Sequence, residues 1–179
     1  MALTRTAAAF KSRVPAVAFA LAASTWLILI LVSPYLVSHN AASSGRFRMA
    51  GLVYLAGHLV CHQRPDRSFH AWGVQFPVCG RCLGLYAGAA VGSLFAAWRP
   101  RRHARGKDEG AASLRTWRMR LTMAVVPTVA SLGLEMTRVW AQSPAVRGVA
   151  ALPLGFAVGW FVAAHADEVV RRVRTAWRV

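Results

Sequence analysis

The sequence predicts an all-α fold, namely a polytopic helical membrane protein with four transmembrane helices and one short interfacial or re-entrant helix. Apolar residues make up 56% of the 179 residues and charged residues only 16%, whereas soluble domains have about 45–50% and about 25%. Long uncharged runs recur along the chain, and the 22 Lys and Arg residues gather between them. That distribution is typical of membrane proteins whose loops follow the positive-inside rule.

Each uncharged run defines one expected element of a single membrane domain covering residues 1–179. The spans are expected at about 15–37, 78–98, 121–140 and 148–164. The first run exceeds the apolar core of a cleaved signal peptide, so we expect it to be retained. Residues 49–62 are apolar but too few to cross a bilayer, which predicts the short helix. Residues 64–77 are expected to form a polar loop.

Basic segments predict which partners the chain contacts. The net charge of +16 would suit nucleic acid, but the charges are separated by apolar runs, so we expect no nucleic acid. The expected partners are the lipid bilayer and its anionic head groups. These would meet a mobile basic loop at about 99–120 and a basic amphipathic tail at 167–179. A plain solvated helical extension is the alternative for the tail.

Small residues recur every four positions in two of the expected spans. Such stripes let two helices approach closely, so we expect the second and fourth spans to pack together. The same stripes also allow a homo-oligomer. Their members are Gly80, Gly84, Gly88 and Gly92 in the second span, and Ala151, Gly155, Gly159 and Ala163 in the fourth.

The distribution of basic residues also predicts the orientation. Four spans place both termini on one side, and that side would hold 15 of the 22 Lys and Arg. The positive-inside rule therefore predicts cytoplasmic termini. The composition suggests a bacterial cytoplasmic (inner) membrane, with residues 61–82 facing the exterior, where disulfides are allowed.

All three cysteines lie in two short polar segments, Cys61-His62-Gln63 and Cys79-Gly80-Arg81-Cys82. His58, Cys61 and His62 follow helical i, i+3, i+4 spacing, so we expect them on one face of the short helix. Cys79 and Cys82 begin a span, where the helix N-terminus favours thiolate, and Arg81 adds positive charge.

Three hypotheses fit these cysteines. The first is a metal site for zinc or another divalent ion, with Cys61, His62, Cys79 and Cys82 as ligands and His58 as an alternative nitrogen. The adjacent Cys61 and His62 cannot easily bind one ion together, which weakens that set. The second is a thiol–disulfide redox protein or a membrane enzyme that uses the same thiols. The third is a purely structural cluster.

Two further side chains are candidates. Glu135 lies inside the third span, where an ionisable residue indicates function by default, although pairing with Arg138 one turn away is equally expected. Ser68, near His70 and Asp66, could serve as a nucleophile, but this polar loop is a weak signal.

The cysteine segments resemble a prokaryotic membrane-protein family known as domain of unknown function 2085. The resemblance is strong over residues 58–92 and is itself without an assigned activity. It implies supporting roles for Arg67, Ser68, Arg81, Tyr86 and Glu135, and it loosely extends to Arg147. The matching residues are Cys61-His62-Gln63, Arg67-Ser68-Phe69, and Cys79, Arg81, Cys82, Gly84, Leu85, Tyr86 and Gly88.

Overall fold

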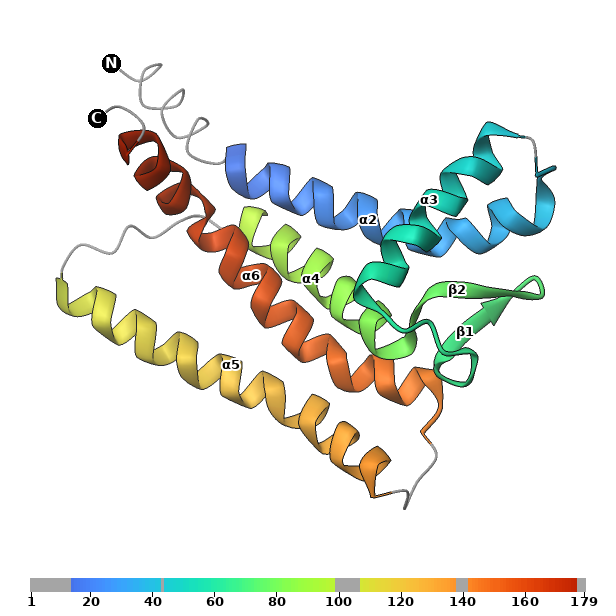
Figure 1. The fold of residues 1–179 in the computed structure, drawn as a ribbon. Coiled ribbons are helices and arrows are strands. Elements are labelled where there is room, and N and C mark those ends of the chain that lie inside the picture. Colours follow the sequence, from blue (N-terminus) through green and yellow to red (C-terminus); the bar gives the residue numbers. More distant parts are fainter. Residues whose placement is uncertain (1–13, 43, 99–106, 138–141, 177–179) are drawn as a thin grey trace.

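The computed structural model describes residues 14–42, 44–98, 107–137 and 142–176. Its described part is a helical bundle whose long helices are α2 (Val14–His39), α4 (Gly80–Trp98), α5 (Lys107–Met136) and α6 (Pro144–Ala176). Figure 1 shows α4 between α2 and α6, with α5 on the outer side of α6. The start of α2, the end of α4, the start of α5 and the end of α6 lie toward one end of the bundle.

Three of these helices are long and apolar enough to cross a membrane, within the described ranges. They are α2, α4, and α6 as far as Ala166. Helix α5 is not among them, because Arg115, Arg118 and Arg120 lie in its first half and Glu135 in its last turn. The third predicted span, 121–140, therefore stays a prediction, and its residues 138–140 lie outside the described ranges.

The glycine stripes join α4 to α6, as the sequence predicted. A Cβ atom on Gly84 would overlap the backbone of Gly148, and one on Gly155 would overlap that of Leu85. Each helix therefore presents bare backbone to the other, which only residues without a side chain allow. Because both stripes are used within the chain, a homo-oligomer would need another surface. The remaining pairs are Gly80 with Pro144, Gly88 with Leu152, Gly92 with Phe156, and Gly159 with Ala89.

A short helix and a hairpin cover the end of the bundle at which α4 and α6 begin. Helix α3 (Gly45–Val60) begins where the Ser44 hydroxyl accepts a hydrogen bond from the Phe47 N–H at 3.1 Å, a typical N-cap. After it come a 3₁₀ turn, η1 (Pro65–Arg67), and the antiparallel strands β1 (Ser68–Ala71) and β2 (Val74–Cys79).

The hairpin corrects two sequence predictions, the all-α fold and the polar loop at 64–77. Its turn is made by Trp72 and Gly73, whose φ angles are 53° and 74°. Two successive positive φ values match the twist of paired strands. Phe69 and Phe76 pack edge to face across the strands, with ring centroids 6.2 Å apart. Those aromatic residues were the strand signal within a stretch that otherwise looks like a loop.

The first of the two basic segments also differs from the prediction. Helix α5 begins at Lys107, so the loop predicted for 99–120 is wrong for 107–120. Helix α6 continues without interruption to Ala176, so the predicted tail is an extension of the last helix. Residues 1–13, 99–106 and 177–179 lie outside the described residues.

Candidate metal centre

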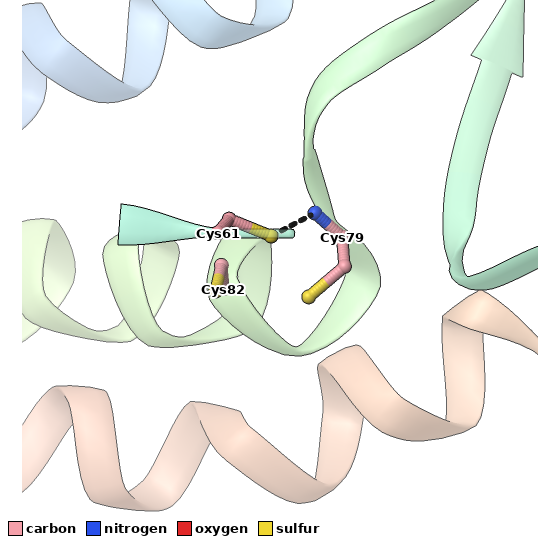
Figure 2. Close-up of side chains that lie close together, drawn as sticks. All are labelled: Cys61, Cys79 and Cys82. Carbon is pink, nitrogen blue, oxygen red and sulfur yellow. Dashed lines mark hydrogen bonds between the residues drawn. The ribbon is translucent and has the colours of Figure 1, made fainter. Parts of the chain in front are cut away.

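Three cysteine side chains converge where α3, β2 and α4 meet. Cys61 directly follows α3, Cys79 ends β2, and Cys82 lies in the first turn of α4. Their three sulfur atoms all lie within 4.8 Å of one another (Figure 2). Each thiol is free, so no disulfide joins them. For comparison, three sulfurs that bind one tetrahedral zinc ion at about 2.3 Å lie about 3.8 Å apart. The thiols are therefore close to the spacing that a metal requires.

Hydrogen bonds attach the end of α3 to the end of β2 and so fix this arrangement. The backbone N–H of Cys79 donates to the Cys61 sulfur at 3.2 Å. Gln63 takes a φ of 47°, which is uncommon for a residue with a side chain. Its side-chain amide donates to the carbonyls of Tyr54 and Pro77, both at 2.8 Å. Gly57 packs so closely on the Pro77 carbonyl that a Cβ would overlap it.

The two histidines of the predicted ligand set do not join the sulfurs. Among the side chains that the structure describes, the potential ligand group consists of the three cysteines, while His58 and His62 are exposed. The prediction that both share a helical face with Cys61 is wrong, because α3 ends at Val60. Cys61 has extended backbone (φ −145°, ψ 136°), and successive side chains of extended backbone point to opposite sides. Burying Cys61 therefore exposes His62.

The surroundings of the thiols are largely apolar. Cys61 is 7% exposed and belongs to a buried cluster with Ile30, Val53 and Val78. Apolar surroundings of this kind keep water away from a bound ion and suit soft thiolate ligands. The side chains packed around that cluster are Trp26, Leu29, Phe76, Cys79, Cys82, Leu83 and Tyr86.

The thiol of Cys79, which lies outside the spans, is made more acidic by its neighbours. Hydrogen bonding from the Cys82 side chain lowers its pKa from 9.0 to about 5, and contacts from Cys61 and from the backbone N–H groups of Cys82 and Arg81 act in the same direction against the effect of burial. At neutral pH Cys79 is therefore a thiolate, the form that binds metals and attacks disulfides. The additional effect of the Arg81 charge that the sequence suggested is not needed to explain this lowered pKa.

The remaining predicted residues surround this centre in other roles. Ser68 is buried, donates to the Arg64 carbonyl at 2.9 Å and accepts from the Gln75 amide at 3.2 Å. These two hydrogen bonds occupy the hydroxyl, so Ser68 stabilises the hairpin, while His70 is exposed. Tyr86 packs edge to face on Trp26, with ring centroids 6.1 Å apart.

Glu135 of α5 belongs to a group of charged side chains that lies beside another face of α4. Its carboxylate contacts the guanidinium groups of Arg67 at 2.8 Å, Arg81 at 3.2 Å and Arg147 at 3.4 Å. The partner expected from the sequence, Arg138, lies outside the described residues. Arg147 was missed as a site residue, because an arginine at the start of a span looks like an ordinary loop charge.

A bundle of largely apolar helices with three cysteines converging at one end, one buried and two half-buried, defines a helical membrane protein with a candidate thiolate site. The chain belongs to the family described as predicted membrane protein, domain of unknown function 2085, whose match covers residues 61–161. This confirms the resemblance inferred from the cysteine motif.

Two relatives from archaea are similar to part of the chain. An uncharacterised protein of Methanocaldococcus jannaschii is 35% identical over 65 residues, which is 36% of this chain and 42% of the relative. An uncharacterised protein of Methanothermobacter thermautotrophicus is 42% identical over 45 residues, which is 25% of this chain and 40% of the relative. The match thus spans under half the length of each relative. Neither supports the bacterial source expected from composition, and no solved structure matches the chain.

Proposed function

We propose that this protein is an integral membrane protein that binds a thiophilic divalent metal, such as zinc, through Cys61, Cys79 and Cys82. The observation that carries the proposal is the convergence of three free thiols within 4.8 Å. They come from three separate segments, namely the residue after α3, the last residue of β2 and the first turn of α4. Thiolate ligands favour zinc and other soft ions over magnesium or calcium.

Three ligands leave one position of a tetrahedral ion open. Closed structural zinc sites have four protein ligands, whereas sites that exchange or activate a ligand have three. The proposed ion would therefore hold water or an exchangeable ligand in its fourth position. The depressed pKa of Cys79 lowers the cost of releasing its proton when the metal binds.

The proposed site faces the exterior of the cytoplasmic membrane, with both termini in the cytoplasm. Four crossings by α2, α4, α5 and α6 would fit the direction of these helices in Figure 1, where successive ends alternate. The end opposite the cysteines would then carry 15 of the 22 basic residues, as the positive-inside rule requires. Anionic lipid head groups would neutralise the basic segments there.

Metal analysis of the full-length protein in detergent tests this proposal. The reduced wild type is expected to hold about one equivalent of zinc, and a variant with all three cysteines changed to serine is expected to hold none. His62→Ala, at an exposed neighbour, is the matched control and should keep the metal. Equal metal content in wild type and the triple variant would refute metal binding, and loss in His62→Ala would add that histidine to the ligands.

Thiol–disulfide exchange is a second candidate, favoured by the lowered pKa of Cys79. Its thiolate would attack a partner disulfide, form a mixed disulfide and release one partner thiolate. Cys82 or Cys61 would then attack the mixed disulfide, leave a disulfide with Cys79 and release the second thiolate, so two electrons pass to the partner.

Thiol trapping in intact cells separates the two candidates. A redox protein should show a fraction of molecules with a Cys79 disulfide that changes when reductant or oxidant is added. Three cysteines that stay reduced under oxidant would contradict exchange and would agree with a metal-protected centre.

A further inference from the structure

Four charged side chains meet at the end of the bundle, on the face of α4 that is turned toward α5 and α6. We call Arg67, Arg81, Arg147 and Glu135 the arginine cluster. The arginines come from η1, α4 and α6, and Glu135 comes from α5. All three guanidinium groups lie within 3.4 Å of the single carboxylate. The fold thus brings four separate segments together at one charged point.

The charges of this cluster do not balance. Three guanidinium groups against one carboxylate leave an excess of two positive charges. The Arg147 side chain is only 7% exposed, Glu135 11% and Arg81 19%, whereas Arg67 is 36% exposed. The nearby Asp66 lies 3.6 Å from Arg67, but its side chain is 58% exposed, so water screens it. Buried charge without a counter-charge is costly, which points to a missing negative partner.

Unused donors support the same conclusion. The Nε atoms of Arg67, Arg81 and Arg147 are buried and make no hydrogen bond. Those of Arg67 and Arg147 make only ion-pair contacts, at 3.6 Å to Asp66 and 3.4 Å to Glu135. The Oε1 atom of Glu135 also makes no hydrogen bond. The arginine cluster also lies at the N-terminal ends of two long helices, because Gly80 at the start of α4 packs on the backbone of Pro144 at the start of α6. Helix N-termini carry partial positive charge and favour anions.

We infer that the arginine cluster binds a phosphate group, either as free inorganic phosphate or as the phosphate of a lipid head group. Several oxygens on one centre can accept from guanidinium groups that approach from different helices, and arginine matches phosphate geometry. A doubly charged phosphate also cancels the excess of two positive charges. Glu135 then serves as a built-in counter-charge that holds the arginines together and competes with the ligand.

This inference does not depend on the proposed metal. Cys79 and Cys82 contact the apolar cluster formed with α2, α3 and β2, whereas Arg81 contacts Ser131 and Glu135 of α5. Loss of metal binding in the cysteine variant therefore leaves the phosphate proposal standing, and the reverse also holds.

Glu135→Gln distinguishes a ligand site from a self-contained group of ion pairs. The full-length protein is purified without phosphate, and its thermal unfolding is followed while phosphate replaces chloride at constant ionic strength. We expect phosphate to raise the melting temperature of the wild type, and Glu135→Gln to bind phosphate at least about tenfold more tightly because the competing charge is gone. Arg81→Gln should bind at least about tenfold more weakly.

Arg46→Gln on α3 is the matched control, since Arg46 is exposed and carries the same charge. A second arm uses vesicles of phosphatidylcholine with or without phosphatidic acid. Stabilisation by phosphatidic acid but not by inorganic phosphate identifies the head group as the ligand, and the converse identifies free phosphate.

Three results would overturn the inference. One is a wild type that responds to neither phosphate nor phosphatidic acid. Another is an Arg46→Gln variant that weakens the response as much as Arg81→Gln does, which would mean general charge attraction. The third is an Arg81→Gln variant with the wild-type response, and this test stands even where Glu135→Gln does not fold.

Discussion

The two faces of the first turn of α4 carry opposite chemistry. One face holds Cys82, with Cys79 just before the helix, against apolar side chains from α2, α3 and β2. The other holds Arg81 against Glu135 and Ser131 of α5. Both faces gain the same helix N-terminus, yet one concentrates negative thiolate and the other positive guanidinium. The comparison shows that the polarity of a helix end does not by itself determine the chemistry of the site beside it. The side chains that neighbouring elements place there determine it.

Disrupting the contact between α4 and α6 should disturb the cysteine centre and the arginine cluster together, and this is the largest effect we expect. Gly84→Val places side-chain carbon on the backbone of Gly148, which should cost at least about 3 kcal/mol in the free energy of unfolding. Gly133→Val, on α5 where a Cβ meets nothing within 4 Å, is the control and should change it by less than about 1 kcal/mol. Detergent-denaturation titrations measure both. Equal costs would show that the helices do not rely on this contact.

The acidity of Cys79 tests whether the two faces are electrostatically separate. In metal-free protein, alkylation of Cys79 should rise with pH around a midpoint of about 5, because only the thiolate above that pKa reacts. Cys82→Ala removes the main hydrogen bond, so the midpoint should rise by about two pH units, or about 2.7 kcal/mol. Arg81→Gln should leave the midpoint unchanged.

Mass spectrometry of the Cys79 peptide across a pH series measures these midpoints. A midpoint that moves upward in Arg81→Gln as far as in Cys82→Ala would show that the charged face controls the sulfur face. In that case the separation described above would be wrong.

The hydrogen bond between Tyr54 and the hairpin should make the smallest contribution to the free energy of unfolding. The Tyr54 hydroxyl donates to the Gln75 carbonyl, and burial raises the pKa of Tyr54 to about 12, so it stays a donor over the whole physiological range. Tyr54→Phe leaves that carbonyl without this donor and should cost about 1 kcal/mol. Tyr35→Phe, at a more exposed ring, should cost less than about 0.5 kcal/mol. Unfolding titrations that give the same value for both would contradict a structural role for the Tyr54 bond.

The sequence predicted features that depend on local patterns. Apolar runs located α2, α4 and α6, four-residue spacing identified the glycine contact, and clustering of cysteines pointed to the candidate centre. It missed the hairpin, because Trp72 is an unexpected residue for a positive φ and the turn signal was weak. It placed His62 with Cys61, because whether a helix stops two residues earlier depends on the bonds that Gln63 makes to distant carbonyls. Arg147 was missed because its burial depends on packing between helices far apart in sequence.

The cysteine centre and the arginine cluster meet at the start of α4, and this has a consequence for synthesis of the chain. Translation produces α2, α3, the hairpin and α4 before α5 and α6, so the three thiols can meet while the rest is still being made. Arg81 and Arg67 must wait for Glu135 and Arg147, which arrive with the last two helices. A chain stalled before α5 would therefore carry all three thiols of the sulfur centre beside two arginines that lack Glu135 and Arg147.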